Sequence, residues 1–276
     1  MKHVFVIVSS IAVILAGIFL PYIHGDYDFF AVGLSYIFQF AAFTSLLFVP
    51  LGLIWFLLNL INGKNTEGVK YPRYIRKSAF VVKVIIVLAS ALGAFASNNR
   101  FSAVIILAIG FFTLFIFHKR IKDLYSLPDN IAPYYFIFIP LSIVFLRLTY
   151  LEKVKDNATD FVITQSEQLI QDIEEYKKIN GHYPISLLST IEDYKPLVSG
   201  IARFHYEPNG DAYNLYFEQI SNMLGTEEIV MYNKLGEHEM TVHNQDLLRI
   251  APSSILRGYH KVSDHPRKDW KIFYFD

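Results

Sequence analysis

Four histidines in the C-terminal half are the residues whose type and spacing come nearest to a known chemistry, the binding of a metal ion. His238 and His243 delimit the segment HEMTVH, while His260 and His265 lie on either side of Asp264. A helical zinc motif places two histidines four residues apart, so that both reach the ion from one helix face. His238 and His243 are five residues apart, in a segment without helical periodicity. We therefore predict solvated loops at both places and no metal site. If a metal were bound, these four histidines would be its candidate ligands.

The other reactive side chains do not form a recognisable catalytic set. Ser253 and Ser254 have no base or oxyanion donor at an identifiable spacing, and Glu207, Asp211 and Glu218 are scattered carboxylates. The chain contains no cysteine, which excludes disulfides, thiolate metal ligands and a cysteine nucleophile. We expect no catalytic residues, no cofactor and no enzymatic activity.

The N-terminal half, residues 1–149, consists mainly of apolar runs, and charge becomes frequent only near Tyr150. A helix needs roughly 17 to 25 residues to cross about 30 Å of hydrocarbon. Five stretches meet this requirement, at residues 4–23, 31–61, 79–97, 101–118 and 132–149. The sequence therefore predicts a multi-pass α-helical membrane domain, followed by a second domain over residues 150–276. The overlong second stretch contains Val49-Pro50-Leu51, and we interpret it as one kinked or tilted span.

Charges in the loops predict the orientation of these spans, because basic loops stay in the cytoplasm. Ten Lys or Arg residues occur in the N-terminal tail and the four inter-span loops, and nine of them fall on one side. The nine are Lys2, Lys64, Lys70, Arg73, Arg76, Lys77, Lys119, Arg120 and Lys122; Arg100 lies on the other side. We predict a cytoplasmic N-terminus and, after five crossings, a C-terminal domain outside the cytoplasm.

Two further charge patterns exclude classes of function. The predicted spans contain no Asp or Glu, and no convergent polar set is recognisable among them, which disfavours an ion-coupled transporter. From Tyr150 onward, 20 acidic residues outnumber 13 basic ones. Because phosphate backbones would repel this excess, we expect no nucleic-acid partner.

The segment after the fifth span has the periodicity of an amphipathic helix that ends at Asn180. Its predicted buried stripe comprises Val154, Ala158, Phe161, Val162, Gln165, Leu169, Ile173, Tyr176 and Ile179. Gly181 suits the left-handed residue that ends a helix, and Pro184 prevents the helix from resuming. Whether one helix runs unbroken from the fifth span to Asn180 stays open, since Asp156 and Asn157 favour caps over helix interiors.

A small antiparallel sheet is predicted after the helix. The hairpin signal is Asn209-Gly210, between two alternating segments. The expected elements are a short helix or turn at Pro184–Tyr194, hairpin strands at Ile201–Glu207 and Ala212–Gln219 joined by residues 208–211, and further strands at Glu228–Asn233 and Trp270–Phe275. The predicted fold of residues 150–276 is thus α+β, with one long helix laid across the sheet.

These residues suggest a family. The pattern is carried by Ile173, Glu174, Tyr176, Lys177, Gly181, Tyr183, Pro184, Ser186 and Leu187, followed by the hairpin YEPNGDAYNLYF. It resembles the globular part of type IV pilin-like and type II secretion pseudopilin-like proteins. In that family the leader, the cleavage site and a glutamate at the fifth mature position stand at the extreme N-terminus, whereas the corresponding span here is the fifth and lacks that glutamate. The resemblance implies a pilin-like module tethered to the inner membrane of a bacterium, outside the cytoplasm, with Gly181, Tyr183, Pro184, Asn209 and Gly210 as structural residues.

Two functions from different classes follow from these observations. The first is a non-catalytic envelope protein that spans the bilayer and presents its outer domain to a protein partner or an envelope component, in envelope assembly or secretion. The alternative is a small-molecule facilitator or membrane enzyme whose site lies among the spans. The sequence leaves the partner and the oligomeric state open.

Overall fold

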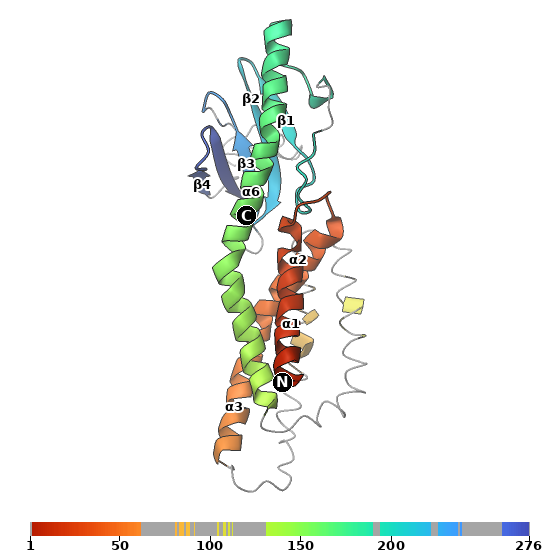
Figure 1. Ribbon diagram of the computed structural model, residues 1–276, viewed down its shortest axis with the longest axis vertical. Coiled ribbons are helices and arrows are strands. Elements are labelled where there is room, and N and C mark those ends of the chain that lie inside the picture. Colours follow the sequence, from red (N-terminus) through yellow and green to blue (C-terminus); the bar gives the residue numbers. More distant parts are fainter. Residues whose placement is uncertain are drawn as a thin grey trace, which may run out of the picture. The chain divides into compact units, whose positions relative to one another are not determined.

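The computed structural model describes residues 2–61, 131–189, 194–221, 226–236, 238 and 261–275, with scattered helical residues between Val81 and Phe112. The chain divides into two compact units (Figure 1). The first unit comprises Met1–Leu20 and Gly33–Leu151, and the second comprises Pro21–Val32 and Glu152–Asp276. The second unit therefore includes a short early segment that the sequence analysis places in the membrane domain.

The first unit is built from apolar helices. These are α1 (Lys2–Phe19), α2 (Phe29–Ser45), α3 (Phe48–Ile61) and the beginning of α6 (Ala132–Asn180). In the part of the chain that the structure describes, three helical segments are long and apolar enough to cross a membrane: His3–Tyr22, Phe29–Ile61 and Pro133–Asn180. They correspond to three of the five predicted spans and are compatible with a membrane protein. The other two, at 79–97 and 101–118, lie for the larger part outside the described residues.

The second span is interrupted between α2 and α3. The amide of Leu46 donates to the Phe43 carbonyl and that of Leu47 to the Thr44 carbonyl, each at 3.1 Å, which closes the last turn of α2. Pro50 is the third residue of α3. Proline is tolerated in a first helical turn because that turn has no intrahelical acceptor for its missing N–H. The interruption of the second span therefore lies at Leu46–Leu47, a few residues before Val49-Pro50-Leu51.

Helix α6 is one continuous α-helix of 49 residues, which answers the question that the sequence left open. It passes through Asn157 without interruption, and Thr159 Oγ1 lies 3.0 Å from the Lys155 carbonyl oxygen. Gly181 follows the helix with φ of 80°, and its amide donates to the Lys177 carbonyl at 2.8 Å. This is the hydrogen bond of a left-handed helix cap, which a residue without Cβ adopts without strain.

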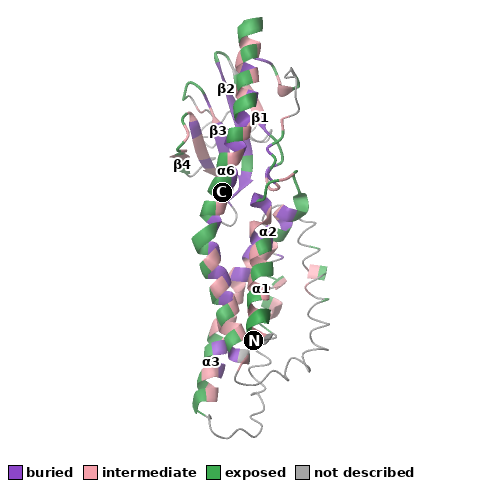
Figure 2. Ribbon diagram, viewed as in Figure 1, coloured by how far each residue is buried: buried purple, intermediate pink, exposed green. Residues whose placement is uncertain are grey.

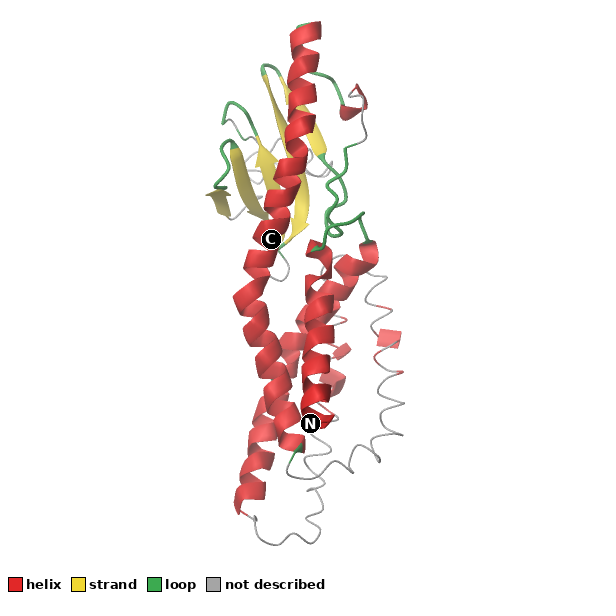
Figure 3. Ribbon diagram, viewed as in Figure 1, coloured by secondary structure: helices red, strands yellow, loops and turns green. Residues whose placement is uncertain are grey.

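The second unit contains a five-stranded antiparallel sheet beside α6 (Figure 3). The strands are β1 (His205–Asn209), β2 (Ala212–Ile220), β3 (Glu227–Tyr232), β4 (Lys261–Asp264) and β5 (Trp270–Phe275), in the spatial order β1-β2-β3-β5-β4. The predicted combination of a long helix with a small antiparallel sheet is confirmed. Strand β4 was not predicted, because it is a short, polar edge strand without apolar alternation.

The β1–β2 hairpin is tighter than predicted. Asn209 pairs with Ala212, so the loop consists of Gly210 and Asp211 alone, with φ of 56° at Gly210. Pro208 belongs to β1 and pairs with Tyr213. A proline is permitted there because β1 is an edge strand and needs no donor on its outer side.

The face of α6 that packs on the sheet differs in part from the predicted stripe (Figure 2). Ala158, Val162, Leu169 and Ile173 are buried as predicted, but Ile179 is 74% exposed. The other buried residues of this face in the second unit are Lys155, Thr159, Ile163 and Ser166. Lys155, Thr159 and Ser166 are polar, so a prediction from hydropathy alone places them on the solvent side of α6.

The early segment of the second unit is joined to a later loop by main-chain hydrogen bonds. His24 forms an antiparallel bridge with Val198. The amide of Gly25 donates to the Leu197 carbonyl and that of Ser199 to the Ile23 carbonyl, each at 2.9 Å. In addition, the His24 ring stacks on Phe161 of α6 at 3.9 Å, and the Tyr22 hydroxyl donates to the Ile220 carbonyl at 3.3 Å. The α1–α2 loop is therefore an integral part of the α+β unit.

Candidate binding groove in the second unit

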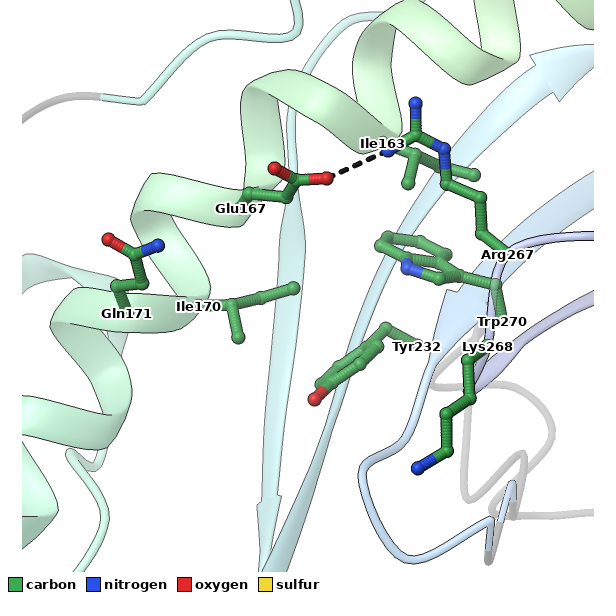
Figure 4. Close-up of a pocket in the computed structure, with 8 residues that line it drawn as sticks. All are labelled: Ile163, Glu167, Ile170, Gln171, Tyr232, Arg267, Lys268 and Trp270. Atoms are coloured by element: carbon green, nitrogen blue, oxygen red, sulfur yellow. Dashed lines mark hydrogen bonds and ion pairs between the residues drawn. The ribbon is translucent and has the colours of Figure 1, made fainter.

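An open groove of about 590 Å³ lies between α6 and the sheet (Figure 4). Its lining comes from one flank of α6, from the last residue of β3, from the first residue of β5 and from the turn that precedes β5. The lining residues are Ile163, Glu167, Ile170, Gln171, Tyr232, Arg267, Lys268 and Trp270. Segments that are far apart in the sequence thus meet at one place.

The aromatic floor of the groove is set by strand pairing. Tyr232 and Trp270 are direct partners across β3 and β5, and their rings lie 5.5 Å apart at an angle of 50°. Trp270 is only 5% exposed, whereas Tyr232 is half-buried. Burial, with a contribution from Asp269, raises the pKa of Tyr232 to about 12, so its hydroxyl stays protonated at physiological pH.

The β4–β5 turn is held to α6 by Arg267. Its Nη1 lies 2.7 Å from Glu167 Oε1, its Nη2 donates to Thr164 Oγ1 at 2.7 Å, and its Nε lies 3.4 Å from Asp160 Oδ1. A guanidinium presents several donors in a fixed plane, which suits it to bridge three acceptors on one helix. The charge of Arg267 is therefore matched by carboxylates of α6.

Lys268, the next residue, has a different environment. Its side chain is 92% exposed, and its ammonium lies 4.0 Å from the Asp269 carboxylate. An exposed ion pair at that distance contributes little, about 0 to 1 kcal/mol. Lys268 therefore leaves a weakly compensated positive charge at the rim of a groove whose other two lining charges, Glu167 and Arg267, pair with each other.

Two of the four candidate histidines lie at this turn. His238 Nε2 is 2.9 Å from the Asp269 carbonyl, and His265 Nδ1 accepts a hydrogen bond from the Arg267 amide at 3.1 Å. Burial lowers the pKa of His265; Asp160 opposes this shift and Arg267 adds to it. His243 and His260 lie outside the described residues. Within the described ranges, no three His, Asp or Glu side chains are grouped to hold a metal ion.

The residues predicted to be structural lie away from the groove. The Tyr183 ring packs 4.9 Å from that of Tyr213, and the Lys177 ammonium lies 4.0 Å above it. The Pro184 carbonyl accepts a hydrogen bond from the Tyr206 hydroxyl at 2.9 Å. Gly181 ends α6, and the Asn209–Gly210 peptide begins the hairpin loop. None of these residues lines the groove.

Sequence reasoning missed the groove residues as a site. The sequence predicts strands for Tyr232 and Trp270 and no role for Arg267 or Lys268. The available signal was the placement of one of the chain's two tryptophans two residues after the basic pair Arg267-Lys268. That signal does not identify α6 as the opposite wall of the groove, because the flank of α6 that faces the sheet is known only from the folded structure.

A second polar cluster lies within the first unit. Arg147 of α6 is only 4% exposed, and its Nη2 donates to Gln39 Oε1 at 2.6 Å. Gln39 donates to Ser35 Oγ at 3.1 Å, which in turn donates to the Ile18 carbonyl at 2.7 Å. The guanidinium also lies 4.6 Å from the centre of the Phe43 ring. The expectation that the spans lack a convergent polar set is therefore wrong. The sequence does not show this set because its polar side chains come from α2 and α6, and its last acceptor is a main-chain carbonyl of α1.

Comparisons with known proteins give no relative: no protein-family model, no curated protein and no solved structure matches the chain.

Proposed function

We propose that this protein is a membrane-anchored binding protein, in which a five-span membrane domain presents the α+β unit to a protein partner outside the cytoplasm. The observation that carries the proposal is the open groove on α6. Its lining includes the partly exposed side chains of Tyr232 and Arg267, and tyrosine and arginine are among the residue types that dominate the energetics of protein interfaces. A helix flank and a β-turn joined by an ion pair form a preorganised surface, which lowers the entropic cost of binding.

The contacts of the α1–α2 loop support the proposed topology. Pro21–Val32 and Glu152–Asp276 form one compact unit, so both lie on the same side of a membrane. The chain must then cross the bilayer an even number of times between them. One crossing by Phe29–Ile61, two by the predicted spans at 79–97 and 101–118, and one by α6 satisfy this requirement. The basic loops then favour a cytoplasmic N-terminus.

The pilin-like interpretation belongs to the same proposal. A long helix packed across an antiparallel sheet and ended by Gly181 is the arrangement that the resemblance implies. On this basis we place the protein in the inner membrane of a bacterium, with the α+β unit in the periplasm or its equivalent. The unit then acts in envelope assembly or secretion through the partner that it binds.

In-cell photo-crosslinking tests the proposal with a matched pair of glutamines on α6. Both glutamines are exposed on α6, but only Gln171 lines the groove. The Gln168 side chain donates to the Asp172 carboxylate at 3.1 Å. A photoreactive phenylalanine analogue at Gln171 should give a discrete protein adduct, and the same analogue at Gln168 should not. Equal adducts at both positions, or none at Gln171 with normal protein levels, would overturn the assignment of the groove.

The Arg147 cluster favours a second candidate, a facilitator or membrane enzyme with its site among the helices, because buried ionisable residues within spans often mark function. Complementation of a deletion strain distinguishes the two candidates. If the groove acts, Gln171→Arg should abolish complementation and Arg147→Lys should retain it at normal protein level. The opposite pattern supports the membrane site.

A further inference from the structure

We propose that the groove takes an extended peptide segment of the partner that presents an apolar side chain with an Asp or Glu beside it. This inference rests on the proposed function and specifies the ligand chemistry of the same site. Three features of the groove lead to it: its apolar walls, its one weakly compensated cation and its covered tryptophan.

The apolar side chain is matched by the walls. Ile163 and Ile170 project from α6 toward the sheet, and Figure 4 shows Ile170 and Tyr232 on opposite sides of the groove. An aliphatic or aromatic side chain that enters between Ile170 and Tyr232 loses water and gains apolar contact on both of its faces. Its burial contributes a binding free energy of about 25 cal/mol for each Å² of apolar surface removed from water. The aliphatic part of Gln171 extends this wall along the helix.

The carboxylate is matched by Lys268. Glu167 and Arg267 neutralise each other at 2.7 Å, so these two lining charges cancel. Lys268 is the lining residue whose charge is weakly compensated, with its ammonium 4.0 Å from Asp269 and its side chain 92% exposed. The acidic excess of the whole unit acts over longer distances and is screened beyond about 8 Å at physiological ionic strength. Direct contact with Lys268 therefore favours an acidic ligand.

The covered tryptophan argues against a saccharide as the ligand. Sugars bind proteins by stacking an apolar ring face on an open aromatic ring, and Trp270 is only 5% exposed. Phe217 packs 6.1 Å and Tyr232 5.5 Å from its ring. A side chain from a peptide needs only the gap between Ile170 and Tyr232, which the groove provides.

Peptide selection tests this inference on the full-length protein in lipid nanodiscs. Phage-displayed random nine-residue peptides are selected against the wild type, and the most enriched peptide is labelled with fluorescein for polarisation measurements. Enriched peptides should carry Asp or Glu next to Leu, Ile, Val or Phe. Lys268→Glu should weaken binding of the labelled peptide about fivefold or more, since an exposed ion pair contributes up to about 1 kcal/mol and reversal adds repulsion.

Two variants control this measurement. Lys178→Glu makes the same charge change at an exposed lysine on α6 that does not line the groove, and it should leave binding within about twofold. Ile170→Arg blocks the apolar wall and should abolish binding. Lys268 is almost fully exposed, so its substitution is not expected to impair folding.

The outcomes separate this inference from the proposed function. No enrichment, enrichment of peptides without acid, or equal binding by wild type and Lys268→Glu overturns the acidic-peptide assignment. If the Gln171 crosslink forms in cells despite such a result, the groove still binds a partner and only its ligand chemistry is wrong. If neither the crosslink nor the enrichment is observed, both proposals fail.

Discussion

Lys155 Nζ lies 2.8 Å from Glu228 Oε2 and 3.0 Å from Oε1, and both side chains are buried between α6 and β3. Gln219 donates to Glu228 Oε2 at 3.0 Å, and Thr159 donates to Gln219 Oε1 at 2.8 Å. The charged pair is thus part of a hydrogen-bonded chain that joins the helix to two strands. Such a network specifies one packing register, since any slip leaves a buried charge without its partner.

Removal of one member of this pair should destabilise the α+β unit more than removal of both. Lys155→Met leaves the Glu228 carboxylate buried without its cation, at a cost of about 3 to 5 kcal/mol. Lys155→Met combined with Glu228→Leu should recover part of this loss. Thermal unfolding followed by Trp270 fluorescence in a Trp55→Phe background measures the difference. A double variant less stable than the Lys155→Met single variant would contradict this account.

A disulfide between His24→Cys and Val198→Cys should form without added oxidant. These residues face each other in an antiparallel bridge, and directly opposed Cα atoms in such pairs lie about 4.5 to 5.5 Å apart, within the range for a disulfide. The chain has no native cysteine, so the mobility shift on a non-reducing gel is specific. Spontaneous oxidation also places the pair outside the reducing cytoplasm.

The control for this crosslink is Asn65→Cys with Val198→Cys. Asn65 lies in a loop that is predicted to be cytoplasmic, so this pair should not crosslink. Failure of the His24 and Val198 pair even with copper phenanthroline would disprove that both segments lie on the same side of the membrane.

Gly200→Ala and Gly181→Ala should both destabilise the protein, for different reasons. A Cβ at Gly200 would lie 2.7 Å from the Pro21 carbonyl oxygen, so the α1–α2 loop must move, at a typical cost of about 1 to 3 kcal/mol. A Cβ at Gly181 meets nothing within 4 Å, but φ of 80° costs an L-residue about 1 to 2 kcal/mol. Only Gly200→Ala should also reduce the yield of the disulfide at positions 24 and 198, measured on the same gels. Equal disulfide yields in the two variants would show that the loop does not depend on Gly200.

Stability of the α+β unit should decrease as the pH falls below 6.5, the ordinary pKa of a histidine side chain. Burial lowers the pKa of His265 below its ordinary value of 6.5, so the unfolded chain binds this proton more readily than the folded one. The stabilisation is complete above that ordinary value and is lost as the pH falls through the lowered pKa. His265→Gln should reduce the pH-dependent shift in melting temperature, and the remainder should include His205, whose pKa burial also lowers. An identical shift in wild type and variant would exclude His265 as its source.

The sequence by itself determined the elements whose signals are local. Hydropathy and length identified three of the helices now seen as apolar enough to span a membrane. The residues around Gly181 predicted where α6 ends, since a left-handed cap depends on the residue at that position alone. The apolar and aromatic run Trp270–Phe275 was predicted as a strand and is β5 with these bounds, and Asn209-Gly210 predicted a hairpin whose loop proved shorter than expected.

Only the tertiary structure decided which polar groups are buried and which segments meet. Hydrophobic periodicity places Lys155 on the solvent side of α6, yet its side chain is buried. Glu228, 73 residues further along the chain, offsets the cost of burying this charge by pairing with it. Ile179 continues the apolar period of α6 but is 74% exposed. The groove on α6, the Arg147 cluster and the pairing of His24 with Val198 likewise arise from segments distant in the chain. The physical reason is that burial and hydrogen-bond satisfaction depend on partners in space, whereas periodicity and turn chemistry depend on neighbours in sequence.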